Sequence, residues 1–272
     1  MSATLLPPRR RLVALFLLWA APALGAPADL YQRADDKLHY QNCLALAARN
    51  PSAALADAEK WAAGQGGAPA RHCEAVALVG LKRYPQAAVL LDALGRAPGV
   101  GDLRPSLFDQ AGNAWLLAGN AAKAVASFQA ALALSAGDAD LYADLARAQA
   151  VMADWPAVEQ DLNAALGIAP WRTDLLVLRA SARRAQGKLK AAAADADAAL
   201  KLSPRSVEAL VERGSVRRDA GDLGGARADF EKALTIRATG PSADDARRNI
   251  AALDAAMKKK AQLPKKPSAR KK

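Results

Sequence analysis

Pairs of small and polar residues recur along this chain at a fixed spacing of 34 residues. The first set is Gly119-Asn120, Ala153-Asp154, Gly187-Lys188 and Gly221-Asp222. A second set keeps the same step: Ala131-Leu132, Ala165-Leu166, Ala199-Leu200 and Ala233-Leu234. A period of this length is typical of arrays in which one supersecondary unit is stacked on its copies. The recurrence therefore predicts four successive units, and it restricts the fold more than any other feature of the sequence.

Composition indicates that the units are helical. Hydrophobic residues make up 52% of the 272 residues, aromatic residues only 5%, and alanine dominates. Alanine has the highest helix propensity and allows helices to approach closely. Alternation with period two and β-branched runs are rare, so we expect an all-α protein with a substantial core.

The units resemble the tetratricopeptide repeat (TPR) family, in which each unit is a pair of antiparallel helices. Counted from Pro105, Ala139, Thr173 and Val207, small residues occupy the family's position 8: Gly112, Ala146, Ala180 and Gly214. Position 24, an aromatic in the family, holds Phe128, Leu162, Ala196 and Phe230. Position 27 is alanine in all four: Ala131, Ala165, Ala199 and Ala233. The resemblance implies a right-handed superhelical solenoid of antiparallel helix pairs, with four TPR repeats over residues 105–240.

Flanking segments complete the predicted organisation. Residues 26–104 match the pattern less well and are expected to form degenerate TPR-like repeats. Residues 241–257 are expected to form a C-terminal capping helix that covers the last apolar face of the array. Residues 258–272, rich in Lys, Pro, Ser and Ala, are expected to form a disordered basic tail. Arginines replace the family's apolar residues at positions 7 and 11 of the last two units, which predicts looser packing or greater exposure there: Arg179, Arg183, Arg213 and Arg217.

The first 25 residues have the organisation of a secretory signal peptide. Arg9, Arg10 and Arg11 precede ten apolar residues from Leu12 to Ala21, and small residues lead to a cleavage site after Gly25. The alternative is an uncleaved anchor, but the apolar stretch is short for a hydrocarbon core of about 30 Å. We therefore predict a periplasmic or secreted protein.

The net charge of +11 comes from the two ends of the chain. Three arginines near the start and eight basic residues from Lys258 to Lys272 account for all of it, so the region between them is neutral. This distribution argues against a basic domain face that binds nucleic acid. The tail alone offers a contact with an anionic membrane or polymer.

The only two cysteines, Cys43 and Cys73, fall on the first helices of adjacent degenerate units. In an oxidising compartment, an even cysteine count favours a disulfide between them, with two buried thiols as the alternative. The only two histidines, His39 and His72, lie beside them in the sequence, which raises the possibility of a zinc site. Adjacent residues on a helix point in different directions, so joint ligation by His72 and Cys73 is awkward, and we predict no metal.

No motif of an enzyme is present. The chain has no Walker A loop, dinucleotide-binding glycine motif, GxSxG or HExxH. We therefore expect neither catalytic activity nor a cofactor.

The TPR resemblance implies that positions 2, 5, 6, 9 and 12 of each first helix line a concave groove. In this sequence they include Asp109, Asn113, Asp140, Asp144, Arg147, Asp174, Ser181, Arg184, Glu208, Glu212, Ser215 and Arg218. Such a groove has an acidic edge and an inner row of arginines, and it complements a partner segment that carries Lys or Arg. A purely solubilising role for these charges is the alternative.

These features predict a non-catalytic protein–protein interaction scaffold of the bacterial envelope, which binds a partner polypeptide in the groove. The alternative is an envelope-anchoring protein that binds an anionic membrane or polymer through its polybasic tail. Single-stranded RNA binding by a helical repeat is a third class, against which the acidic groove argues.

Overall fold

The computed structural model describes residues 35–262, and all bounds below refer to that part of the chain. The predicted signal peptide, residues 1–25, lies outside it, as do residues 263–272 of the predicted basic tail. The described residues form helices and no strand, which confirms the predicted all-α, TPR-like class. They divide into two compact units, which we call unit 1 (up to Ile168) and unit 2 (from Ala169).

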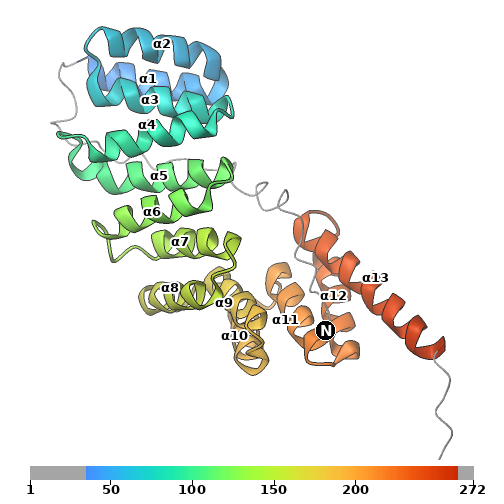
Figure 1. Ribbon diagram of the computed structural model, residues 1–272. Helices are drawn as coiled ribbons and strands as arrows, with labels where there is room; N and C mark the ends of the chain where they lie inside the picture. The colour runs from blue at the N-terminus through green and yellow to red at the C-terminus, as the bar shows by residue number, and fades with distance from the viewer. Residues whose placement is uncertain (1–34, 263–272) are drawn as a thin grey trace, which may run out of the picture. The chain divides into compact units, whose positions relative to one another are not determined.

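Unit 1 is a stack of eight α-helices in which each helix contacts the next along the chain (Figure 1). In order they are α1 (Asp36–Arg49), α2 (Pro51–Ala63), α3 (Gly67–Gly80), α4 (Tyr84–Arg96), α5 (Arg104–Leu117), α6 (Ala121–Leu132), α7 (Ala139–Val151) and α8 (Trp155–Ile168). A short 3-10 helix, Gly101–Leu103, connects α4 to α5.

Unit 2 contains two helix pairs and a final long helix. These are α9 (Thr173–Ala185), α10 (Leu189–Leu202), α11 (Val207–Asp219), α12 (Leu223–Ile236) and α13 (Pro241–Gln262). The helix α13 contacts both α11 and α12, as the first helix of a further pair would. It continues five residues into the segment expected to be a disordered tail, because Lys258 to Gln262 contain strong helix formers and no glycine or proline.

The recurring small and polar pairs are the points where the chain turns between helices. Gly119, Gly187 and Gly221 have φ angles of +77°, +74° and +91°, a region that glycine adopts without steric cost. Ala153 holds the same position in the remaining unit, with φ +59°. The polar residue that follows can start the next helix: Oδ1 of Asp222 accepts a hydrogen bond from the amide of Gly225 at 2.9 Å.

Within two of the pairs, a glycine on the first helix lies against a phenylalanine on the second. A Cβ atom added to Gly112 would lie 2.6 Å from Cε1 of Phe128, and one added to Gly214 would lie 2.6 Å from Cε1 of Phe230. Both phenylalanines are fully buried. The small residue at position 8 therefore leaves the room that the aromatic ring at position 24 fills, as the family pattern implies.

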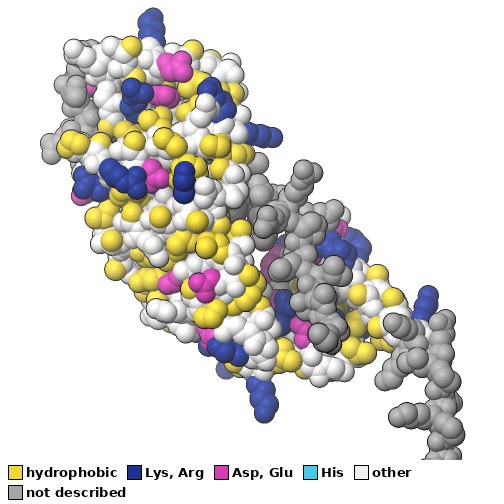
Figure 2. Space-filling view, viewed as in Figure 1, with side chains coloured by type: hydrophobic (Ala, Val, Ile, Leu, Met, Phe, Trp, Pro, Cys, Tyr) yellow, Lys and Arg dark blue, Asp and Glu magenta, His cyan; other side chains and the backbone are white. Residues whose placement is uncertain are grey.

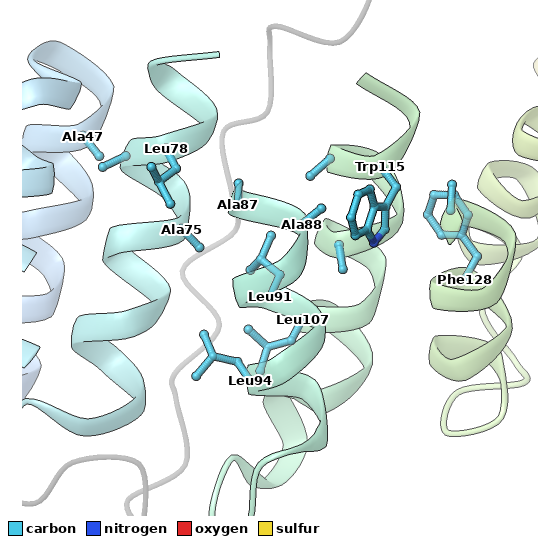
Figure 3. Close-up of a cluster of buried hydrophobic side chains, with 14 of the residues drawn as sticks. Ala47, Ala75, Leu78, Ala87, Ala88, Leu91, Leu94, Leu107, Trp115 and Phe128 are labelled. Carbon is cyan, nitrogen blue, oxygen red and sulfur yellow. The ribbon is translucent and has the colours of Figure 1, made fainter. Parts of the chain in front are cut away.

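The main core of unit 1 consists of leucines and small alanines that interlock with two large aromatic rings. Figure 3 shows Leu91 and Leu94 of α4 beside Leu107 of α5, with Trp115 and Phe128 at the end of the cluster. All five side chains are almost completely buried. The interiors of the α4–α5 and α5–α6 contacts are thus chiefly apolar.

In unit 2 the same interior positions are charged. Arg179 of α9 forms a bidentate pair with Asp195 of α10, at 2.9 and 2.7 Å, and Arg183 reaches the same carboxylate at 2.8 Å. The Asp195 side chain is only 6% exposed. We call this arrangement of two arginines around one buried aspartate an Arg–Asp–Arg clamp.

A second clamp follows 34 residues later. Arg213 of α11 holds Asp229 of α12 at 2.9 and 2.7 Å, and Arg217 contacts it at 2.8 Å. Arg213 also reaches Asp197 of α10 at 3.0 Å, which links the two pairs. The expectation of looser packing took no account of these ion pairs: in each clamp, the single carboxylate at position 23 joins both arginines of the first helix to the second helix.

Candidate functional site

A connected row of polar side chains crosses the first helices of unit 1, and we call it the polar ladder (Tyr40, His72 and Gln110). The hydroxyl of Tyr40 in α1 is hydrogen-bonded to Nδ1 of His72 in α3. Nε2 of His72 lies 2.9 Å from Oε1 of Gln110 in α5. Since that amide oxygen accepts, Nε2 carries the proton and Nδ1 accepts from the tyrosine. Burial lowers the pKa of His72, partly opposed by the Gln110 bond, so the ring is neutral.

The sequence alone did not reveal the polar ladder as part of the groove. His72 and Gln110 occupy positions 5 and 6 of units counted from Ala68 and Pro105, which are groove positions in the family. The sequence indicated His72 only as a possible metal ligand, because the degenerate unit matches the family pattern poorly. The groove positions that these two residues occupy are the signal by which the sequence could have identified them.

The five predicted groove residues of unit 1 lie on α5 and α7. Nδ2 of Asn113 is 3.2 Å from both Oδ1 and the backbone oxygen of Asp109, one turn earlier in α5. On α7, Arg147 forms an ion pair with Asp144. Asp140, one turn before Asp144, is exposed. These residues combine three carboxylates with a single arginine.

Electrostatics distinguishes Asp109 from the other carboxylates. Burial raises the pKa of Asp109 to about 7, and the negative charges of Asp144, Asp138 and Asp140 add to the effect. Burial also raises the pKa of Asp144, but its pair with Arg147 opposes this. Among the described side chains of residues 35–258, no lysine or arginine lies in ion-pair contact with Asp109. With a pKa of about 7, the carboxyl group of Asp109 is only partly ionised near neutral pH. A cation bound beside it would favour the ionised form.

In unit 2, the predicted groove arginines are paired with acids of the same unit. Arg184 of α9 lies 2.7 Å from Glu212 and 3.3 Å from Asp219, both on α11. Burial raises the pKa of Glu212, and the charge of Arg184 opposes this. Arg218 is 2.8 Å from Asp219 and is hydrogen-bonded to Asn249 of α13. This face of unit 2 is thus largely neutralised from within.

The remaining predicted residues of unit 2 are also engaged locally. Asp174 forms an exposed pair with Arg172 at 2.7 Å, and Glu208 forms one with Arg237 at 2.9 Å. Exposed pairs of this kind contribute little stability. The last two are serines within helices, one half-buried and one buried: Ser181 and Ser215.

The two cysteines predicted to pair are joined by a disulfide. Their Cα atoms are 6.1 Å apart, and the bond links α1 to α3. The ring of His39 is stacked on that of Trp61, with centroids 4.1 Å apart, and its Nε2 lies 2.9 Å from Oδ2 of Asp57. Because both sulfurs are bonded to each other, neither is a thiolate, and the zinc alternative loses two of its four ligands. The described part of the chain contains no cluster of His, Cys, Asp and Glu suited to a metal.

Within residues 35–262, no helix combines the length and the apolar composition that a membrane span requires.

Comparison with known sequences and structures identifies the fold. The sequence model of the tetratricopeptide repeat matches residues 207–239, which contain α11 and α12. The search of curated proteins returns no match.

Several solved structures have a similar fold at low sequence identity. The C-terminal part of a TPR repeat-containing protein from Cytophaga hutchinsonii has a TM-score of 0.63 and 16% identity, covering 83% of this chain and 89% of that one. MamA from Desulfovibrio magneticus RS-1 has a TM-score of 0.56 and 17% identity, covering 62% and 94%. YrrB, described as a TPR protein with an unusual peptide-binding site, has a TM-score of 0.53 and 16% identity, covering 70% and 96%. At these identities the similarity concerns the fold.

Proposed function

We propose that this chain, which belongs to the tetratricopeptide repeat family, is a non-catalytic scaffold that binds another polypeptide. Helix pairs stacked in this way present long rows of first-helix side chains, and such rows suit an extended or helical partner segment. YrrB, which has a similar fold, is described by its peptide-binding site, and this supports the same kind of role here.

Asp109 carries the proposal that unit 1 provides the binding face. Its carboxyl group is partly buried, has a pKa raised to about 7 and has no cationic partner among the described side chains of residues 35–258. In unit 2, by contrast, Glu212 already has Arg184 at 2.7 Å. A partner cation gains most where the carboxylate is desolvated and uncompensated, so the first helices of unit 1 are the better site.

The chemistry of this face indicates the kind of partner segment. Gln110 already bonds to His72 and Asn113 to Asp109, but an amide oxygen can accept two hydrogen bonds, which leaves capacity for the backbone N–H groups of a bound peptide. A lysine or arginine of that peptide would neutralise Asp109. On the face shown in Figure 2, basic and acidic side chains are dispersed among apolar ones.

Binding of a lysine should be measurable as proton release. A nearby ammonium group favours the ionised form of Asp109, so the carboxyl loses its proton as the peptide binds. Affinity for a lysine peptide should therefore increase between about pH 6 and pH 8, since the folded pKa is about 7.

A panel of short peptides in which one lysine is replaced by norleucine tests the site. For each lysine peptide that binds the original protein, we expect the Asp109→Asn variant to bind about tenfold more weakly, as measured by fluorescence anisotropy. Asp174→Asn is the matched control, because Asp174 lies on unit 2 and already has Arg172. Equal affinity of every lysine and norleucine peptide, or equal loss in both variants, would contradict the assignment.

The proposed location is the bacterial envelope, either the periplasm or the outside of the cell. The signal-peptide pattern of residues 1–25 and the disulfide Cys43–Cys73 support it, because disulfides persist in oxidising compartments. A reporter fusion that is active only after export tests this. Activity without residues 1–25 equal to that of the full fusion would refute it.

Envelope anchoring by the polybasic tail is the second candidate, favoured by eight basic residues between Lys258 and Lys272. A salt wash of membranes that carry the full chain or a chain without this segment separates the two functions. Release of the full chain by salt, with no retention of the shortened one, would favour anchoring. Equal membrane retention and equal salt release of the two chains would contradict anchoring by the tail, and protein binding would remain as the proposed function.

A further inference from the structure

The helix α1, at the start of the described chain, is poorly anchored by its own side chains. Of its 14 residues it buries only Asp36, Cys43 and Ala47, whereas α3 buries six. Leu38 is 62% exposed. The side chain of Asp35, at the N-terminus of the helix, makes no capping hydrogen bond. A helix of this length is marginal in water without packing against a neighbour.

Ala47 of α1 belongs to the main core of unit 1, and Leu46 packs against it, but the ion pair and the ring stacking of α1 are at the surface. His39 stacks on Trp61 and pairs with Asp57, but the side chains of His39 and Asp57 are each 39% exposed. Pairs this exposed contribute little. Tyr40 adds its hydrogen bond to His72 in the polar ladder.

The disulfide is the most deeply buried attachment of α1. Cys43 and Cys73 are 1% and 0% exposed and form a small apolar cluster with Ala58, separate from the main core of unit 1. The bond closes a sequence separation of 30 residues between α1 and α3. It therefore removes a large share of the conformational freedom that undocked α1 would have.

We propose that the docking of α1, and with it the completion of the polar ladder, is a redox-controlled step. When Cys43 and Cys73 are thiols, α1 is undocked and Tyr40 is absent from His72. Oxidation forms the Sγ–Sγ bond, and two electrons and two protons pass to a disulfide-bearing thiol oxidoreductase, which becomes a dithiol. The bond then holds α1 against α3, and Tyr40 closes the ladder.

This step changes the surface that α3 presents. Without α1, Nδ1 of His72 loses the hydroxyl donor of Tyr40, and the side chains of Cys73 and Ala58 become exposed to solvent. The stack then ends at α2 and α3 instead of α1. The docking step itself is independent of the proposed function; only its consequence for binding rests on it, through His72 and Gln110.

Hydrogen exchange of the free protein, followed by mass spectrometry with and without dithiothreitol, tests the step. We expect amides of α1 to exchange at least about tenfold faster after reduction, while those of α5 to α8 change by less than about twofold. Unchanged protection of α1 would overturn the proposal. So would equal loss of protection across α1 to α8, because reduction would then unfold the unit instead of releasing one helix.

Two variants separate the disulfide from the ladder. The double variant Cys43→Ser/Cys73→Ser should exchange in α1 like the reduced protein, and dithiothreitol should have no further effect on it. Tyr40→Phe keeps the disulfide and loses only the hydrogen bond to His72, so its α1 should change by less than about threefold. Release of α1 by Tyr40→Phe as complete as that by reduction would show that the hydrogen bond holds the helix, which contradicts the proposal.

A second readout reports on His72 itself. The chain contains only two histidines, so their proton resonances can be assigned by comparison with a His39→Gln variant. Reduction should raise the pKa of His72 towards its ordinary value, because the departure of α1 exposes the ring to water. An unchanged titration of His72 after complete reduction would mean that α1 stays docked. No partner is needed for either measurement, so failure of the proposed binding function leaves this test intact.

Discussion

The helix pairs α5–α6 of unit 1 and α11–α12 of unit 2 differ in the interior positions beside their shared glycine and phenylalanine. In α5–α6, Trp115 occupies position 11 and Ser127 occupies position 23. In α11–α12, Arg217 and Asp229 occupy these positions, and together with Arg213 they form an Arg–Asp–Arg clamp. Both solutions bury the residue at position 23 and keep the two helices in contact.

The difference between the two pairs shows what a repeat position requires. The side chains there must fill the space between the helices, and their polar groups must have hydrogen-bond partners. Either an aromatic ring or a set of ion pairs can meet both requirements. The two solutions respond differently to change, however. Apolar contacts weaken in proportion to the atoms removed, whereas loss of one member of a buried ion pair leaves a charge without a partner.

Replacement of the shared phenylalanine should have the largest effect and be similar in both pairs. We expect Phe128→Ala and Phe230→Ala each to reduce the free energy of unfolding by about 3–5 kcal/mol, because each ring is fully buried against a glycine. Urea titrations followed by circular dichroism measure this. A loss below about 1 kcal/mol in only one variant would show that the two pairs do not share this packing.

Substitution at position 23 should reduce the free energy of unfolding by different amounts in the two helix pairs. Asp229→Ala leaves Arg213 and Arg217 without their common carboxylate, and we expect a loss of about 3 kcal/mol. Ser127→Ala removes a single hydroxyl, which donates to Asp92 at 2.9 Å, and should cost about 1 kcal/mol. Equal losses in the same urea titrations would mean that the clamp adds nothing beyond ordinary packing.

The pH dependence of unit 1 should depend on Asp109. Its folded pKa of about 7 lies above the ordinary value of 3.8, so the folded protein keeps a proton that the unfolded chain releases. This contribution to stability is complete below about pH 4 and is lost as the pH rises through about 7. Asp109→Asn should therefore stabilise the protein at about pH 8 by roughly 2 kcal/mol and have little effect at about pH 4.

Thermal unfolding of the two proteins over this pH range measures the difference. The same variant is expected to bind lysine peptides less well, so greater stability should accompany weaker binding. A stability difference independent of pH would show that the pKa of Asp109 is the same in the folded and the unfolded protein.

Replacement of the whole charged clamp in α11–α12 by apolar side chains should have the smallest effect on the free energy of unfolding. The triple variant Arg213→Leu/Arg217→Leu/Asp229→Ala removes all the charges of one clamp together, and we expect its stability to lie within about 1 kcal/mol of the original protein. Asp229→Ala alone is its control, because it removes only the central charge. A loss in the triple variant as large as in the single variant would show that apolar side chains cannot fill the space between α11 and α12.

Much of the local structure could be predicted from the sequence because it depends on short-range geometry. Turns at Gly119, Gly187 and Gly221 follow from the positive φ that glycine tolerates. The contact of Gly112 with Phe128 follows from a spacing repeated along the chain. With only two cysteines, the partner of Cys43 was also determined once a disulfide was expected.

The candidate site was less predictable. The residues named for the groove are present, but the sequence did not show that Arg184 is neutralised by Glu212 while Asp109 has no cation. It also omitted His72 from the groove. Charge partners depend on side-chain direction and on the register between neighbouring helices, and a repeat pattern specifies neither.

The sequence by itself determined the helical class, the 34-residue unit and the closeness of paired helices, because helix propensity, glycine geometry and side-chain size act over a few residues. Only the tertiary structure decided that the arginines of α9 and α11 clamp buried aspartates, and that Tyr40, His72 and Gln110 join three helices. Hydrogen bonds and ion pairs require donors and acceptors within about 3 Å in defined directions. Residues far apart in the chain meet that condition only after the helices have packed.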